Sequence, residues 1–190
     1  MKKLLAVLLV VIPLLTACGF LAGSAVGSAV STSVINERRC INTVTEDHSI
    51  HYQASLKFKS DPSLKHTHLI VSAFNHFALL AGEVQSGYQR QQAEALLRSI
   101  PEVKRIYNSV TIGPVISPKM RSKDAWITAK VRSAMLADFS LNSTQIKVTT
   151  EDGTVYLMGI VTERQASTVT DIAKQIRGVK RVVKLFEYDA

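Results

Sequence analysis

The feature that most constrains the fold is an internal repeat, because subtracting 77 from positions in the second half of this 190-residue chain recovers the first half. The matched pairs are Asp47 with Asp124, Ile50 with Ile127, Asp61 with Asp138, Leu64 with Leu141, Val71 with Val148, Leu80 with Leu157, Gly82 with Gly159, and Val84 with Val161. Further on the offset becomes 76, and Val-Lys-Arg-Val at 179–182 falls on Val-Lys-Arg-Ile at 103–106. The chain therefore carries two copies of one unit of about 70 residues, the size of a small domain.

The second copy shows the order of elements most clearly. Apolar residues at helical spacing predict a helix over 124–137. Two β-rich runs follow at 146–150 and 155–161, on either side of Asp152 and Gly153, a pair typical of a two-residue hairpin turn. The sequence therefore predicts one helix followed by an antiparallel pair of strands.

A second helix over 163–177 and a closing strand over 179–188 complete the unit, with Gly178 placed as a C-terminal cap between them. The apolar side of each helix must cover the hairpin, because nothing else in so short a unit can bury it. The predicted fold class is α+β: two tandem αββαβ modules, each a three-stranded mixed sheet with two helices packed on one face.

The N-terminal segment has the composition of an export signal. A Met-Lys-Lys start is followed by an apolar run over 4–15 and then by Leu-Thr-Ala-Cys at 15–18. The apolar run is interrupted by Pro13 and is too short to cross a hydrocarbon core, which needs about 20 residues. We expect residues 1–17 to be a signal peptide and not a membrane-spanning helix.

The Leu-Thr-Ala-Cys string resembles the lipobox of bacterial lipoproteins, in which the cysteine is acylated and becomes the first residue of the mature protein. Cys18 is therefore the predicted lipid-attachment residue, with an ordinary secretory signal as the alternative. Gly19 follows it where an Asp would resemble an inner-membrane retention signal, which favours a lipid-anchored protein on the periplasmic face of the outer membrane. An acylated Cys18 cannot pair with Cys40, so no internal disulfide is expected.

The remaining boundaries follow from composition. Residues 18–43 are predicted to be the lipidated cysteine and a flexible tether, although glycines four apart at 19, 23 and 27 are also typical of a close-packed helix. The first module is placed at 44–113, a proline-containing linker at 114–121 and the second module at 122–190.

The αββαβ order and the Gly-Val-Lys-Arg-Val string at 178–182 resemble the BON family, with one domain in each module. The lipobox and the Asp-Ala-Trp-Ile-Thr-Ala-Lys-Val-Arg-Ser string at 124–133 are similar to dual-BON outer-membrane lipoproteins associated with division sites and envelope stress. The first copy departs from the pattern, since Asn75-His76 replaces Asp-Gly at the hairpin turn and Pro101-Glu102 replaces Arg177-Gly178. We expect the first copy to keep the fold, and we expect no ligand role for it.

The first helix of the second module carries the candidate site. On a helical wheel Trp126 projects about 100° away from Ile127, and Leu136 lies nearly opposite the core. Exposed apolar residues with cations around them suit a membrane interface, in which the ring lies at head-group depth. The cations nearby in the sequence are Lys119, Arg121, Lys123, Lys130 and Arg132. Packing of Trp126 against the other module or the linker is an equal alternative on this evidence alone.

The resemblance favours the membrane, because it implies that this helix binds anionic phospholipid such as phosphatidylglycerol or cardiolipin. The predicted phospholipid-binding residues are Trp126, Lys130, Ser133, Leu136 and Ala137. The charge agrees with an anionic partner: the formal net charge of +8 becomes +6 once Lys2 and Lys3 leave with the signal peptide. Nucleic acid is not an expected partner of an exported protein.

The sequence contains no pattern typical of an enzyme: no nucleophile elbow, no phosphate-binding glycine loop and no Cys/His pair. Asp47 and Asp124 are interpreted as helix N-caps, and Glu151 as part of a turn. The five histidines all lie in the first module, without the Asp, Glu or Cys partners of a metal site; they are His48, His51, His66, His68 and His76. We therefore expect no catalytic residue, no metal and no cofactor.

These observations predict a non-enzymatic outer-membrane lipoprotein that binds anionic phospholipid and helps to maintain envelope integrity. The resemblance also implies enrichment at division sites. The alternative is a periplasmic adaptor for a protein partner such as the outer-membrane β-barrel assembly machinery, bound through the first module or an open sheet edge.

Overall fold

A computed structural model describes residues 41–189. The predicted signal peptide, Cys18 and nearly all of the tether lie outside these residues, so the lipid attachment stays a prediction. No helix among the described residues is both long enough and apolar enough to cross a bilayer.

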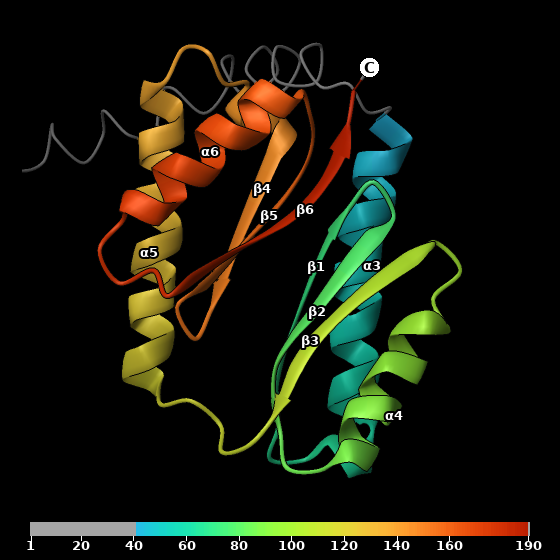
Figure 1. Cartoon of the computed structure of the whole chain (residues 1–190). Helices are drawn as coiled ribbons and strands as arrows, with labels where there is room; N and C mark the ends of the chain where they lie inside the picture. Colours follow the sequence, from blue (N-terminus) through green and yellow to red (C-terminus); the bar gives the residue numbers. More distant parts are fainter. Residues whose placement is uncertain (1–40, 190) are drawn as a thin grey trace, which may run out of the picture. The chain divides into compact units, whose positions relative to one another are not determined.

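The two modules have the same order of elements (Figure 1). The first contains α3 (Ile41–Ser60), the short 3₁₀ helix η1 (Pro62–Leu64), β1 (His68–Phe74), β2 (Phe77–Val84), α4 (Gly87–Arg98) and β3 (Arg105–Ile112). The second contains α5 (Pro118–Ala137), η2 (Ser143–Gln145), β4 (Ile146–Glu151), β5 (Thr154–Val161), α6 (Glu163–Gln175) and β6 (Arg181–Tyr188). The predicted αββαβ order is confirmed in both.

Each module has a mixed three-stranded sheet. The strand orders are β1-β2-β3 and β4-β5-β6, with an antiparallel hairpin first and then a parallel neighbour. A parallel neighbour needs a crossover, which α4 and α6 supply. In each module both helices lie on the same face of the sheet (Figure 1), as the predicted fold class requires.

The core of each module fills the space between its helices and its sheet. In the second module Ile127, Val131 and Met135 of α5 are buried against Val148 and Leu157 of the hairpin. These α5 residues are members of the apolar stripe that the sequence predicts. The first module repeats this core with the equivalent positions of α3, β1 and β2.

A third apolar cluster joins the two sheets on the faces that carry no helix. Phe74 and Leu79 of the first module pack with Tyr156, Met158 and Leu185 of the second. Polar side chains support the contact: Ser109 Oγ lies 2.6 Å from the Tyr156 hydroxyl, and Lys147 Nζ donates to the Ala73 carbonyl at 2.9 Å. The sequence does not predict this contact between the modules.

The predicted helix N-cap at Asp124 is wrong. The helix α5 begins at Pro118, inside the segment predicted as linker, and Ser117 is its N-cap. Asp124 lies buried within the helix, and its carboxylate accepts hydrogen bonds from the backbone N–H groups of Asp152 and Gly153, at 2.9 and 2.8 Å. The carboxylate is needed there because a tight turn leaves two donors without backbone partners.

The same correction holds for Asp47 in the first module. It lies within α3 and accepts from the backbone N–H groups of Asn75 and His76, at 2.8 and 2.9 Å. Both turn residues adopt the left-handed conformation, with φ of 52° and 64°, although neither is glycine. His76 is held further by Glu46, whose carboxylate lies 2.6 Å from the ring Nε2. The repeated aspartate therefore fastens each first helix to its hairpin turn, and this turn keeps its shape without Asp-Gly.

Candidate functional site

The helix α5 presents an exposed face directly away from its core. Trp126 and Leu136 are 47% and 69% exposed, and small exposed residues, among them Ala129 and Ser133, lie between them along the helix. We call this surface the α5 outer face; it consists of Trp126, Ala129, Lys130, Ser133, Leu136 and Ala137. All five predicted phospholipid-binding residues belong to it, whereas their binding role stays a prediction.

The geometry of Trp126 suits a boundary between apolar and polar surroundings. Lys130, one turn further along the helix, places its Nζ 5.6 Å from the centroid of the indole ring. This is within the range of a cation–π contact, and it brings a positive charge next to a large apolar surface. An indole with an ammonium group beside it suits the membrane interface, where the acyl chains end and the phosphates begin.

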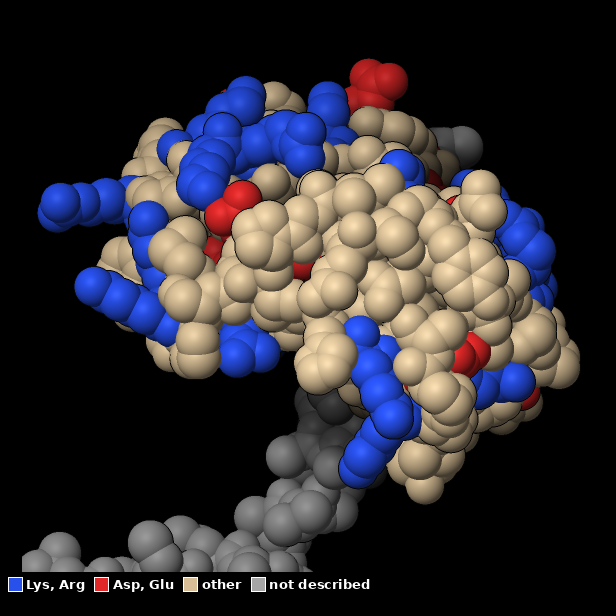
Figure 2. Space-filling view, turned by 90° about the horizontal axis from the view of Figure 1, so that it is seen from below, with Lys and Arg blue, Asp and Glu red and all other residues tan. Residues whose placement is uncertain are grey.

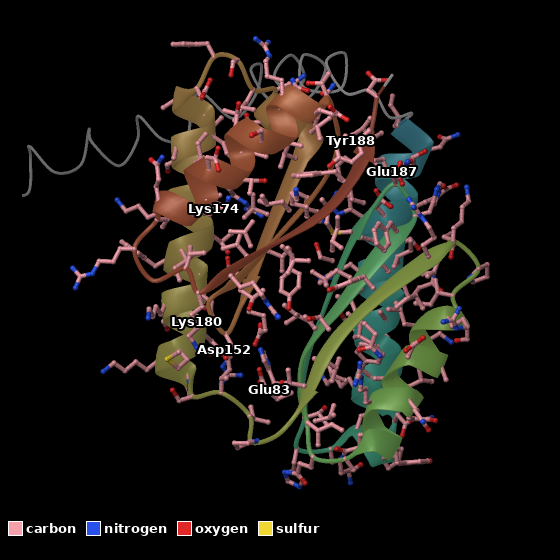
Figure 3. All side chains as sticks on the ribbon, in the orientation of Figure 1. Glu83, Asp152, Lys174, Lys180, Glu187 and Tyr188 are labelled. Atoms are coloured by element: carbon pink, nitrogen blue, oxygen red, sulfur yellow. The ribbon has the colours of Figure 1, made fainter. Side chains whose placement is uncertain are left out.

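Positive charge gathers around the beginning of α5. Figure 2 looks at the end of the molecule where α5 begins, and Lys and Arg side chains gather on its left, the side on which α5 lies in Figure 1. Lys119, Lys123 and Lys130 are exposed and form no ion pair within the described residues. Lys180, by contrast, is bound to Asp152 at 2.7 Å (Figure 3), so its charge is partly neutralised.

A hollow of about 530 Å³ lies beside α5, on a different side of the helix from Trp126. Arg121 and Arg132 of α5 line it together with His68 of β1 and Glu151 of β4. Glu151, interpreted from the sequence as part of a turn, is the last residue of β4 directly before that turn, and it is buried. Its Oε1 has no hydrogen bond and lies 3.3 Å from the Nε2 of His68.

Burial, and after it the negative charges of Glu83 and Asp124, together raise the pKa of Glu151 to about 8. Burial also lowers the pKa of His68, so that its neutral form is favoured. The hollow therefore holds the two arginines of α5 and a carboxyl group whose protonated form is favoured by its surroundings. No sequence pattern indicated it, because the groups come from both modules.

Comparison with known proteins identifies both modules. The BON domain family matches residues 53–114 and 123–190, which is more than half of the chain. The chain belongs to the BON-domain family. The resemblance seen in the sequence is therefore confirmed for both copies of the repeat.

Among curated proteins, the chain is 34% identical over 163 residues to the outer membrane lipoprotein DolP of Haemophilus influenzae, covering 85% of this chain and 84% of that protein. A 21 kDa hemolysin of Actinobacillus pleuropneumoniae is 31% identical over 79% of this chain and 78% of its own. Osmotically-inducible protein Y of Escherichia coli is 26% identical over 75% and 72%. Each of these matches is longer than one repeat unit of about 70 residues.

The histidines of the first BON domain do not meet at one site. His51 Nδ1 lies 2.9 Å from the Val71 carbonyl, His76 is next to Glu46, and His68 is next to Glu151. Within residues 41–189 no group of three or more His, Cys, Asp or Glu side chains is placed to hold a metal ion. The described histidine contacts instead support the local structure of the hairpin and of the contact between the sheets.

Proposed function

We propose that this BON-domain chain is an outer-membrane lipoprotein, anchored through an acylated Cys18, that binds anionic phospholipid through α5 of its second domain. In this function it supports envelope integrity, carries out no catalysis and faces the periplasm. The observation that carries the proposal is the α5 outer face, which combines the exposed Trp126 and Leu136 with Lys130, and which lies on the same helix as Lys119 and Lys123; none of the three lysines forms an ion pair within the described residues.

The two kinds of side chain contribute to binding in different ways. Each lysine close to an anionic surface contributes about 1 kcal/mol, so Lys119, Lys123 and Lys130 together favour an anionic over a neutral membrane by about 100-fold. Trp126 and Leu136 supply apolar area that is independent of lipid charge. Because a multiply acylated cysteine already retains a protein at the membrane, this face selects which lipid the body contacts.

The corresponding face of α3 in the first BON domain has a different composition, with Tyr52 and Leu56 at the positions of Ala129 and Ser133. By the 77-residue offset, Ser49 and Gln53 take the positions of Trp126 and Lys130, and the Gln53 side chain donates to Ser49 Oγ at 2.9 Å. Lys59 takes the position of Leu136. We therefore assign phospholipid binding to the second domain alone.

Vesicle flotation tests the proposal with a chain of residues 19–190, which lacks the acylated cysteine. We expect it to float with phosphatidylcholine vesicles that contain phosphatidylglycerol or cardiolipin, and not with phosphatidylcholine alone. Trp126→Glu should abolish flotation, whereas the matched control Tyr52→Glu should not, because Tyr52 is an exposed aromatic residue of α3 in the first domain. Equal flotation of the parent and Trp126→Glu would contradict the assignment.

A protein partner is the second candidate function, favoured by the exposed Tyr52 and Leu56 one turn apart on α3. Such an adaptor would bind a component like the outer-membrane β-barrel assembly machinery through its first domain. Salt separates the two functions, because lipid binding through lysines weakens as ionic strength rises and an apolar protein contact does not.

A further inference from the structure

The most exposed large apolar side chain among the described residues is Phe139, which follows the end of α5. Its relative exposure is 101%, so the ring contacts almost nothing else in the protein. Leu136, one turn earlier, is 69% exposed. A phenyl ring left wholly in water forgoes the stabilisation that burial gives, and two such side chains together mark a surface for an apolar partner. Phe139 is not among the site residues that the sequence predicts.

The segment that carries Phe139 is fixed by its neighbours. Asp138 leaves the helical conformation with ψ of 104°, and its Oδ1 accepts from the backbone N–H and the hydroxyl of Ser140, at 2.9 and 2.7 Å. Leu141 closes the turn, because its N–H donates to the Asp138 carbonyl at 3.1 Å and its side chain is buried in the core. The turn therefore holds Phe139 outward at its tip.

The positions along α5 define how the helix can meet a flat surface. Trp126 and Leu136 are ten residues apart, which is about 15 Å along the helix axis. They point about 80° apart, one on each side of the direction opposite to the buried Ile127 and Val131. Ala129 between them is too small to hold the helix away. One flat surface therefore touches both ends of the α5 outer face only when the helix axis lies along it.

We infer that Phe139 is a second membrane anchor, and that α5 lies along the bilayer surface with Trp126 inserted at one end and Phe139 with Leu136 at the other. The inference rests on the proposed phospholipid binding and specifies its geometry. The occupant is a membrane and not an apolar peptide, because three lysines that form no ion pair within residues 41–189 accompany Trp126 on the same helix, namely Lys119, Lys123 and Lys130. They place cations where the phosphates lie while the rings enter the acyl region.

The single tryptophan of the chain makes the geometry measurable. In the chain of residues 19–190, Trp126 itself reports on the first anchor. The double variant Trp126→Phe/Phe139→Trp moves the only indole to the tip of the turn. The matched control is Trp126→Phe/Tyr52→Trp, which puts it on the exposed surface of α3. Each protein is mixed with phosphatidylglycerol vesicles whose acyl chains carry bromine, a quencher that acts only at contact.

We expect bromine to quench the indole at 126 and at 139, and to leave the indole at 52 unquenched. Phe139→Ala should weaken vesicle binding about tenfold without changing its salt dependence, and Phe139→Leu should retain most of the binding. Because the side chain is fully exposed, these variants should keep the far-ultraviolet circular dichroism and melting temperature of the parent.

Quenching at 126 but not at 139 would overturn the second anchor and leave the proposed function standing. Quenching at 139 alone would overturn the parallel orientation, because the helix would then stand on its C-terminal end. Without quenching at either position, both the inference and phospholipid binding through α5 fail.

Discussion

Replacing Glu151 by Gln should stabilise the protein, and the gain should grow as the pH rises above 5. The Glu151 side chain is buried with one oxygen unbonded, and the carboxyl group of Glu83, also buried, adds negative charge beside it. Glu83, labelled in Figure 3, accepts a hydrogen bond from the backbone N–H of Ile116 at 3.2 Å. His68, Asp124 and Asp152 also lie near Glu151, and Arg121 and Arg132 line the same hollow. A glutamine keeps the shape of Glu151 and cannot ionise.

The direction in which stability changes with pH follows from the direction of the pKa change. The pKa of Glu151 is raised from 4.5 in an unfolded chain to about 8 in the folded protein. Between these values the unfolded chain is ionised and the folded chain is protonated, so unfolding releases a proton and becomes more favourable as the pH rises. A difference of 3.5 in pKa corresponds to about 5 kcal/mol. Solvent in the hollow screens part of this, so we expect about 2–3 kcal/mol.

Urea denaturation at pH 5, 6, 7 and 8 measures this effect. The free energy of unfolding of Glu151→Gln minus that of the parent should rise by about 2–3 kcal/mol across the series. The control Glu163→Gln, on the exposed surface of α6, should show a constant difference. Parallel pH profiles for Glu151→Gln and the parent would refute a buried, uncompensated carboxyl group.

Three further substitutions test the packing by the same denaturation assay. Asp124→Ala should cost about 3 kcal/mol, because it leaves the two N–H groups of the hairpin turn without an acceptor; a loss below 1 kcal/mol would contradict this. Gly159→Ala should cost about 2 kcal/mol, since a Cβ there would lie 2.5 Å from the Gln145 carbonyl oxygen, and an unchanged melting temperature would contradict the close approach. Tyr156→Phe should cost about 1 kcal/mol through the lost hydrogen bond to Ser109, and a stabilised variant would show that this bond is not formed.

The secondary structure and the outward position of Trp126 could be predicted because both depend on local periodicity. The role of Asp124 could not be predicted, because an acidic residue before an apolar helical pattern is typical of an N-cap. The true hydrogen-bond partners of Asp124 lie 28 and 29 residues away in the sequence. The burial of Glu151 could not be predicted either, because it depends on groups of the other domain. One signal was present for the contact between the sheets: residues 155–161 are nearly all apolar, which is typical of a strand buried on both faces.

That contact explains why the chain needs two domains while only one carries the α5 outer face. An αββαβ module with both helices on one side leaves the other face of its sheet bare. Here the bare faces are apolar, with Leu79 in the first domain and Met158 in the second, and each is less than 2% exposed because it packs in the shared cluster. A single domain would present this face to water and would favour association. The first domain, which has Ser49 where the second has Trp126, therefore contributes by covering the sheet of the second and leaving α5 free on the opposite side.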